Sequence, residues 1–312
     1  MLSATIPLLL RQSYLSASPN TRSPFLGPFA VLIVHSLARF VGLGVVYSTL
    51  GLVFLTLGSW GQMQSSGPET MPVVPVPAGA VYWSNLATVI TAALAGLQAI
   101  FSPDGSNWTT TVSYHITFPL TLLPVLLFLA SYASIAPPKD VVEARNELVK
   151  YNAEQVSYSF ERTWSYFRKA ALASAGLYWY GLSRVILGLY VHNEKLTPPA
   201  TYMLVNSALL GVGLTLSIVI ERLTVRSLAP IHPLTGRPRP HLAVEAHRAI
   251  SLAPAGNPSL ERGLVAPIIL GILAGPGAAA SLWWSGGEEE GGWYGRRAWR
   301  ETTATMAAKK AT

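Results

Sequence analysis

Five long apolar stretches constrain what this chain can fold into more than any other feature of its sequence. They cover residues 41–60, 81–101, 112–135, 170–191 and 201–220. Each has the length of about 20 residues that an α-helix needs to cross the ~30 Å hydrocarbon core of a bilayer. The only Asp, Glu, Lys or Arg inside them is Arg184, in the fourth stretch. We therefore expect an all-α polytopic membrane protein.

A sixth apolar segment near the end of the chain is shorter. Residues 264–274 are apolar, Gly275-Pro276-Gly277 interrupts them, and residues 278–284 are apolar again. Because glycine and proline interrupt helices, this segment either crosses the bilayer in broken form or enters it and returns. We expect five to six transmembrane helices with extended Pro-rich connectors, such as residues 61–80.

The composition supports a membrane protein and excludes several other classes. Half of the residues are hydrophobic, 12% are charged and the mean hydropathy is +0.37. An ordinary soluble domain carries about 25% charged residues. The chain has no cysteine, which excludes a disulfide framework, a thiolate metal site and a thiol nucleophile. We expect no metal and no nucleic-acid partner.

The polar connectors divide the chain into five regions. Residues 1–40 are a targeting-like N-terminal arm with an interfacial segment, and residues 41–136 hold three spans. Residues 137–228 combine an amphipathic polar helix with a two-span hairpin. Residues 229–262 are a polar extended excursion, and residues 263–312 are a Gly-rich apolar segment with a charged tail.

The N-terminal segment predicts the compartment. No acidic residue precedes Glu69, and the first residues are rich in serine and leucine and carry Arg11 and Arg22. This composition is typical of mitochondrial or plastid targeting segments. The segment that follows either begins one long tilted helix near Phe29 or forms an interfacial helix that feeds the first span.

The distribution of basic residues predicts the orientation. Residues 137–169 and 221–262 together carry 12 Lys and Arg residues. The loops 102–111 and 192–200 carry only Lys195. By the positive-inside rule, the two basic blocks face the matrix if the membrane is the inner mitochondrial membrane.

Arg184 is the one charged residue inside an apolar stretch. Charges within a bilayer are expensive and often functional, so Arg184 could serve conduction or ligand binding. It lies about two turns from the end of its stretch at Val191, so its side chain could also reach the interface or bond to another helix. We favour the second interpretation.

Three histidines at the edges of apolar stretches, His35, His115 and His192, are candidate axial ligands for a haem b iron. The topology places His115 and His192 near the same face, which makes them the better matched pair. A lone histidine at such a position is more often a hydrogen-bonding residue of the interface. No cofactor is therefore the main expectation, and haem b is the alternative.

Basic residues gather where the fourth and fifth spans meet the matrix side. Arg168, Lys169, Arg222 and Arg226 form this group. Such a group suits anionic lipid head groups such as cardiolipin. Positive-inside topology explains the same group equally well.

The acidic residues argue against transport and catalysis. No carboxylate lies inside the five stretches, which disfavours ion-coupled transport. Glu161 and Glu221 stand at span ends, where we interpret them as markers of the water boundary. Nucleotide-binding, metalloprotease and serine-hydrolase motifs do not occur, and we do not expect an enzyme.

Residues 157–228 contain several short motifs. Phe160-Glu161-Arg162 is followed by Phe167 and Tyr178-Trp179, and the second span ends in Arg222-Leu223-Thr224-Val225-Arg226-Ser227-Leu228. In these residues the segment resembles small mitochondrial inner-membrane proteins that assist respiratory-chain assembly. The likeness covers less than a quarter of the chain. This chain differs from the group because three or more predicted spans precede the two-span hairpin. The resemblance implies an inner-membrane location and a supporting, non-catalytic role, with no functional residue carried over.

Together these patterns predict a non-catalytic accessory subunit, or an assembly factor, of a mitochondrial oxidative-phosphorylation complex such as the respiratory chain or ATP synthase. Its partners would be other membrane subunits and anionic lipids. Two alternatives remain open. One is a haem b-bearing membrane anchor of a redox complex, and the other is a carrier or channel.

Overall fold

The described part of the chain is helical throughout. The computed structural model describes residues 2–18, 27–65, 74–101, 139, 141–192, 195, 198–227 and 260–311. Its helices are α1 (Leu2–Ala17), α2 (Pro28–Val41), α3 (Leu43–Val46), η1 (Tyr47–Gly51), α4 (Leu52–Ser65), α5 (Ala78–Phe101), α7 (Val141–Val149), α8 (Ala153–Ile186), η2 (Leu187–Val191), α9 (Pro198–Ser227), α11 (Leu260–Leu273) and α12 (Pro276–Ala311). No strand occurs among these residues, so the predicted all-α class is confirmed.

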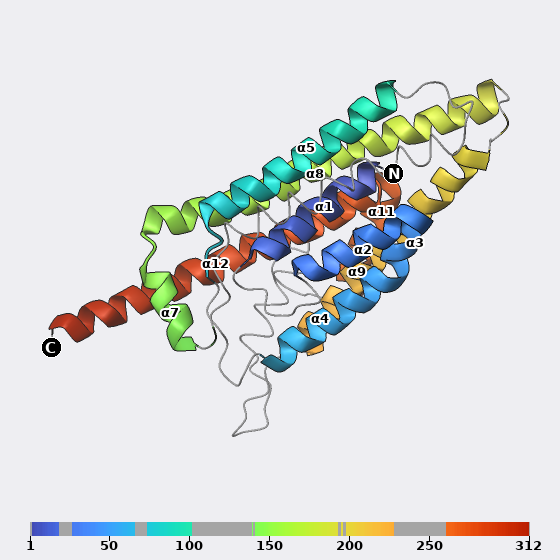
Figure 1. Ribbon diagram of the computed structural model, residues 1–312. Coiled ribbons are helices and arrows are strands. Elements are labelled where there is room, and N and C mark those ends of the chain that lie inside the picture. Colours follow the sequence, from blue (N-terminus) through green and yellow to red (C-terminus); the bar gives the residue numbers. More distant parts are fainter. Residues whose placement is uncertain are drawn as a thin grey trace.

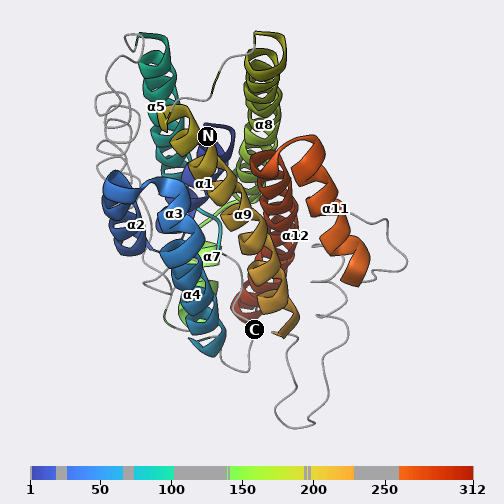
Figure 2. The same cartoon turned by 90° about the vertical axis from the view of Figure 1, so that its right-hand side faces the viewer.

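The helices form an elongated bundle of two groups (Figure 1). In the first group α1 packs against α5, α8 and α12. In the second group α9 packs against α3, η1 and α4, and α2 packs against α3. Because α9 also contacts α12 and α1, it joins the two groups. Figure 2 shows α11 beside α12 at the edge of the bundle.

The N-terminal helix α1 lies in the centre of the bundle rather than at its edge. Leu8, Leu9 and Ala17 are almost fully buried. The hydroxyls of Ser13 and Ser84 each donate to the backbone carbonyl of the other residue, at 3.3 Å, which joins α1 to α5. Residues 2–17, which we predicted to belong to a targeting-like N-terminal arm, thus form a core helix.

A turn at Gly42 separates α2 from the first apolar stretch. α2 ends at Val41 and α3 begins at Leu43, and Gly42 between them has a φ of +89°. This left-handed conformation favours glycine because no Cβ clashes there. Of the two predicted arrangements, the structure has a separate helix before the first stretch.

α8 and α12 are long helices that run antiparallel along each other. The Ser285 hydroxyl donates to the Trp164 carbonyl at 3.1 Å, and the Trp299 indole donates to the Tyr151 carbonyl at 2.8 Å. α8 begins after Asn152, whose side chain caps it by accepting from the Gln155 amide at 2.7 Å. The predicted charged tail is thus helical, and its part up to Trp299 packs along the first half of α8.

The interrupted sixth segment is a helical hairpin. α11 ends at Leu273 and α12 begins at Pro276, and the two helices pack together. Gly275 between them has a φ of +89°, and a Cβ there would lie 2.6 Å from the Tyr178 ring. The turn therefore requires glycine and seats the hairpin against α8.

The described residues establish the predicted spans only in part. One described helix segment, Ala200–Glu221 of α9, is long and apolar enough to cross a membrane. The shorter segments Phe29–Ala38 and Leu43–Gly58 are also apolar. The third predicted span, residues 112–135, lies outside the described residues. α8 and α9 follow one another as predicted for a hairpin, but they pack against α1 and α12 rather than extensively against each other.

Candidate functional site

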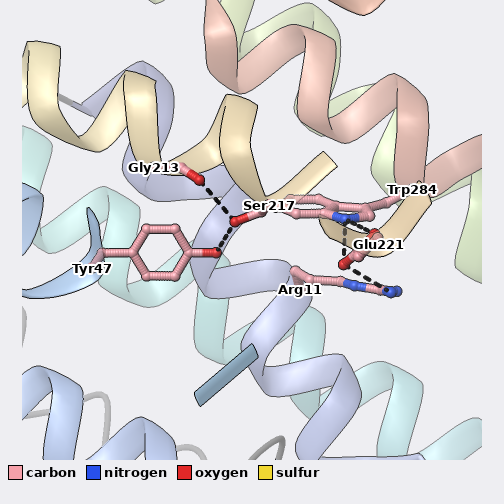
Figure 3. Close-up of polar contacts among 6 residues, drawn as sticks. All are labelled: Arg11, Tyr47, Gly213, Ser217, Glu221 and Trp284. Atoms are coloured by element: carbon pink, nitrogen blue, oxygen red, sulfur yellow. Dashed lines mark hydrogen bonds and ion pairs between the residues drawn. The ribbon is translucent and has the colours of Figure 1, made fainter. Parts of the chain in front are cut away.

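A polar cluster lies inside the bundle where α1, α9 and α12 meet (Figure 3). Arg11 of α1 and Glu221 of α9 form an ion pair, with 3.6 Å between Nη2 and Oε1. Trp284 of α12 donates from Nε1 to both carboxylate oxygens of Glu221, at 3.0 Å and 3.2 Å. The Arg11 guanidinium lies 5.6 Å from the centre of a Trp284 ring. The Glu221 carboxylate therefore links three helices.

Aromatic side chains pack beside this ion pair and limit its contact with solvent. The side chains of Arg11 and Glu221 are 18% and 16% exposed. Phe167 of α8 is almost fully buried, and its ring lies 6.0 Å from Tyr14 and 6.1 Å from Trp284. Opposite charges attract more strongly here than in water, and removal of one would leave the other poorly solvated.

A second polar contact lies one turn before Glu221 on α9. The Ser217 hydroxyl donates to the Gly213 carbonyl at 2.8 Å, and the Tyr47 hydroxyl lies 2.9 Å from Ser217 Oγ. With the serine proton used on Gly213, the Tyr47 hydroxyl donates to Ser217. Tyr47 opens the π-helix η1, and π-helical turns recur at functional sites.

The close approach of η1 and α9 depends on a small residue. A Cβ on Gly213 would lie 3.0 Å from the Tyr47 ring and 3.3 Å from the Ser48 backbone. Any larger residue at position 213 would push η1 away from α9. The glycine thus positions the Tyr47 hydroxyl on Ser217.

None of the sequence patterns predicted this cluster. The prediction that Glu221 only marks the water boundary is wrong, because its carboxylate binds Arg11 and Trp284 inside the bundle. Glu161, for which we made the same prediction, is exposed. One signal could have indicated the pair: Arg11 follows three leucines and Glu221 follows Ile220, so opposite charges stand directly at the ends of two apolar segments.

The described haem candidates lie in different environments. His35 is buried on α2, and its Nε2 lies 2.7 Å from the Gln12 side-chain oxygen on α1. His192 follows η2 and is exposed. His115 lies outside the described residues. Within the described ranges, no group of three or more His, Cys, Asp or Glu side chains could hold a metal ion.

The structure describes the side chains of two of the four predicted lipid-binding residues, Arg168 and Lys169 of α8. The Arg168 guanidinium lies 4.1 Å from the centre of the Trp164 ring, and Lys169 Nζ lies 5.5 Å from that of Tyr166. Both basic side chains are exposed. The side chains of Arg222 and Arg226, on the last turns of α9, lie outside the described residues. Each of the two basic side chains thus lies near an aromatic ring of its own helix.

Removal of the Tyr47 hydroxyl tests the contact between η1 and α9. We expect Tyr47→Phe to lower the free energy of unfolding by about 1 kcal/mol, because a buried hydrogen bond is lost while Ser217 keeps its bond to Gly213. Denaturant unfolding in detergent measures this value. Tyr82→Phe is the control, since Tyr82 is 58% exposed. Equal effects of the two substitutions would contradict the contact.

Tyr151 lies between α7 and α8, and its environment predicts that the free energy of unfolding depends on pH in the alkaline range. Burial, and to a smaller degree the negative charge of Glu147, raise the pKa of Tyr151 above its ordinary value of 10.0. The protonated phenol therefore contributes stability that is present below pH 10 and is lost as the pH rises through the raised pKa. We expect the free energy of unfolding to fall less steeply above pH 10 in Tyr151→Phe than in the wild type. Parallel curves above pH 10 would contradict this prediction.

No family model matches this chain, and no curated protein or solved structure is significantly similar to it.

Proposed function

We propose that this chain is a polytopic inner-membrane protein of mitochondria and a non-catalytic subunit or assembly factor of a respiratory-chain or ATP synthase complex. The observation that carries the proposal is the distribution of its side chains. Large apolar residues face outward on several helices, whereas Arg11 and Glu221 pair inside the bundle. This is the arrangement that a membrane favours.

The apolar outer surface extends over both groups of helices. Phe40 of α2 is 83% exposed, Leu172 of α8 is 76% exposed and Ile272 of α11 is 67% exposed. Soluble monomers rarely expose large contiguous apolar patches. Lipid chains and other membrane subunits are the surroundings that suit such a surface.

The interior polar contacts support a structural role. Glu221 binds side chains from two other helices, and His35 bonds to Gln12 between α2 and α1. Bonds of this kind between helices fix how the helices pack in a membrane. The inner mitochondrial location is supported by the acid-free N-terminal sequence and by the resemblance of residues 157–228 to assembly proteins.

The contact between Trp299 and Tyr151 supports five spans rather than six. It places the last part of α12 beside the start of α8, and hence on the side of the basic block 137–169. The α11–α12 hairpin would then enter the membrane and return to the same side. Such a re-entrant element is stable where other helices cover it.

The lack of cysteine in the chain makes this topology directly testable. Asn146, Lys195 and Ala304 are exposed and can each be replaced by a single cysteine. We expect a membrane-impermeant maleimide to label Asn146→Cys and Ala304→Cys from the matrix side and Lys195→Cys from the opposite side. The wild type gives the unlabelled background. Labelling of Ala304→Cys and Lys195→Cys from one common side would contradict the five-span topology.

Native-gel migration tests the function itself. The tagged protein is extracted from mitochondria in mild detergent, and mass spectrometry identifies what co-migrates with it. Stoichiometric co-migration with a respiratory complex or ATP synthase would support a subunit, and substoichiometric co-migration would support an assembly factor. Migration alone, or glycosylation of the Asn107-Trp108-Thr109 sequon in the secretory pathway, would contradict the proposal.

A further inference from the structure

α8 and η2 carry a row of exposed residues along the predicted fourth span. The row consists of Ala173, Gly176, Tyr180, Arg184, Leu187 and Val191, and we call it the Arg184 stripe. Its members are three or four residues apart, so they share one face of the helix. All six are exposed, and so are Trp179, Ile186 and Tyr190 on neighbouring faces of this end of α8, whereas the buried residues Ala170, Ala171 and Ser174 lie at the start of the stripe. In Figure 1 this end of α8 extends beyond the start of α12.

Arg184 is the charged residue of the stripe, and lipid chains alone would give it no counter-charge. It stands seven residues before Val191, or about 10 Å into the predicted span at ~1.5 Å per residue. Among the described residues its guanidinium has no ion-pair partner. Charged side chains within a membrane pair with one another or line a polar surface. The predicted third span, residues 112–135, contains no carboxylate that could supply the partner.

The stripe also has the shape that close helix packing needs. A Cβ on Gly176 would meet nothing within 4 Å, so this glycine leaves space at the surface of α8. Small residues such as Ala173 and Gly176 allow a second helix to approach closely in a membrane. Tyr180 is 67% exposed and Val191 is 62% exposed, and they provide apolar contact area on the same face.

We propose that the Arg184 stripe is the docking surface for a transmembrane helix of a partner subunit. The partner helix carries an aspartate or glutamate that pairs with Arg184 near the membrane face opposite the basic blocks. This inference rests on the proposed function and names the surface through which the chain joins its complex. Charge complementarity favours a carboxylate-bearing helix over lipid chains, which carry no charge that could pair with Arg184.

Two variants of the full-length protein test the surface without touching the core. Arg184→Gln removes the charge, and Gly176→Leu fills the space where the partner would approach. We expect each to reduce the fraction that co-migrates with the complex about tenfold or more, while unfolding in detergent stays at the wild-type midpoint. Arg162→Gln is the matched control, because Arg162 is an exposed basic residue of α8 outside the span. It should co-migrate normally.

Photocross-linking then identifies the occupant. A benzoylphenylalanine at Tyr180 should form an adduct with one partner helix that contains a carboxylate. Exchanging the charges, with Arg184→Glu and the partner carboxylate changed to lysine, should restore co-migration. The docking surface would be overturned if the adducts formed only with lipid or with residues 112–135. Normal co-migration of Arg184→Gln and Gly176→Leu would overturn it too, and neither outcome would affect the proposed function. Failure of the wild type to co-migrate would overturn the proposed function and the surface with it.

Discussion

Replacing Glu221 with alanine should lower the free energy of unfolding by about 3 kcal/mol. Removal of one member of a buried ion pair typically costs about 3–5 kcal/mol, because the remaining charge stays in a poorly solvated place. The low end of that range applies here, since the Arg11 and Glu221 side chains are 18% and 16% exposed. The substitution also removes the acceptor of the Trp284 indole. Denaturant unfolding in detergent measures the loss.

Three further variants separate the charge from the hydrogen bond. Glu221→Gln keeps an oxygen for Trp284 and should lose less than Glu221→Ala. The double variant Arg11→Ala, Glu221→Ala should be less destabilised than the sum of the single variants, because no charge is stranded. Glu161→Ala, at an exposed glutamate of α8, should change little. Additive effects of Arg11→Ala and Glu221→Ala would contradict the ion pair.

Hydropathy was sufficient to predict the helical class and several helix positions. The second predicted stretch lies within α5, and the fifth lies within α9. Both predictions rest on a run of apolar residues, which constrains the backbone strongly. The break inside the sixth segment was also visible, because Gly275 and Pro276 stand there.

The interior of the bundle was not predictable in the same way. Hydropathy does not show which way a side chain at the end of an apolar run points. From the sequence alone, Glu221 could equally have faced water or Arg11. The central place of α1 depends on contacts with α5, α8 and α12, which are distant in the sequence. This segment is a leucine-rich helix with few charges. That composition is typical of targeting segments, and it also suits a helix that is buried in a bundle.

Replacing Gly44 with alanine should destabilise the protein by about 3 kcal/mol or more. A Cβ at this position would lie 1.9 Å from the backbone carbonyl oxygen of Asn206, and backbone cannot move aside as a flexible side chain does. The change would also disturb the bond from the Gly44 amide to Asn206 Oδ1, now 2.8 Å. Gly181→Ala is the control, because a Cβ there meets nothing within 4 Å. It should be neutral or stabilising, as alanine favours helix more than glycine.

Gly42 makes the test more specific, because the obstacle there is a side chain. A Cβ on Gly42 would lie 2.1 Å from Asn206 Nδ2, and the φ of +89° adds backbone strain to any substitution. Asn206→Ala removes the atoms that clash with position 42 but leaves the carbonyl oxygen that faces position 44. We therefore expect Asn206→Ala to relieve part of the Gly42→Ala defect and none of the Gly44→Ala defect in thermal unfolding. Equal relief of both would show that the turn does not pack on α9 as described.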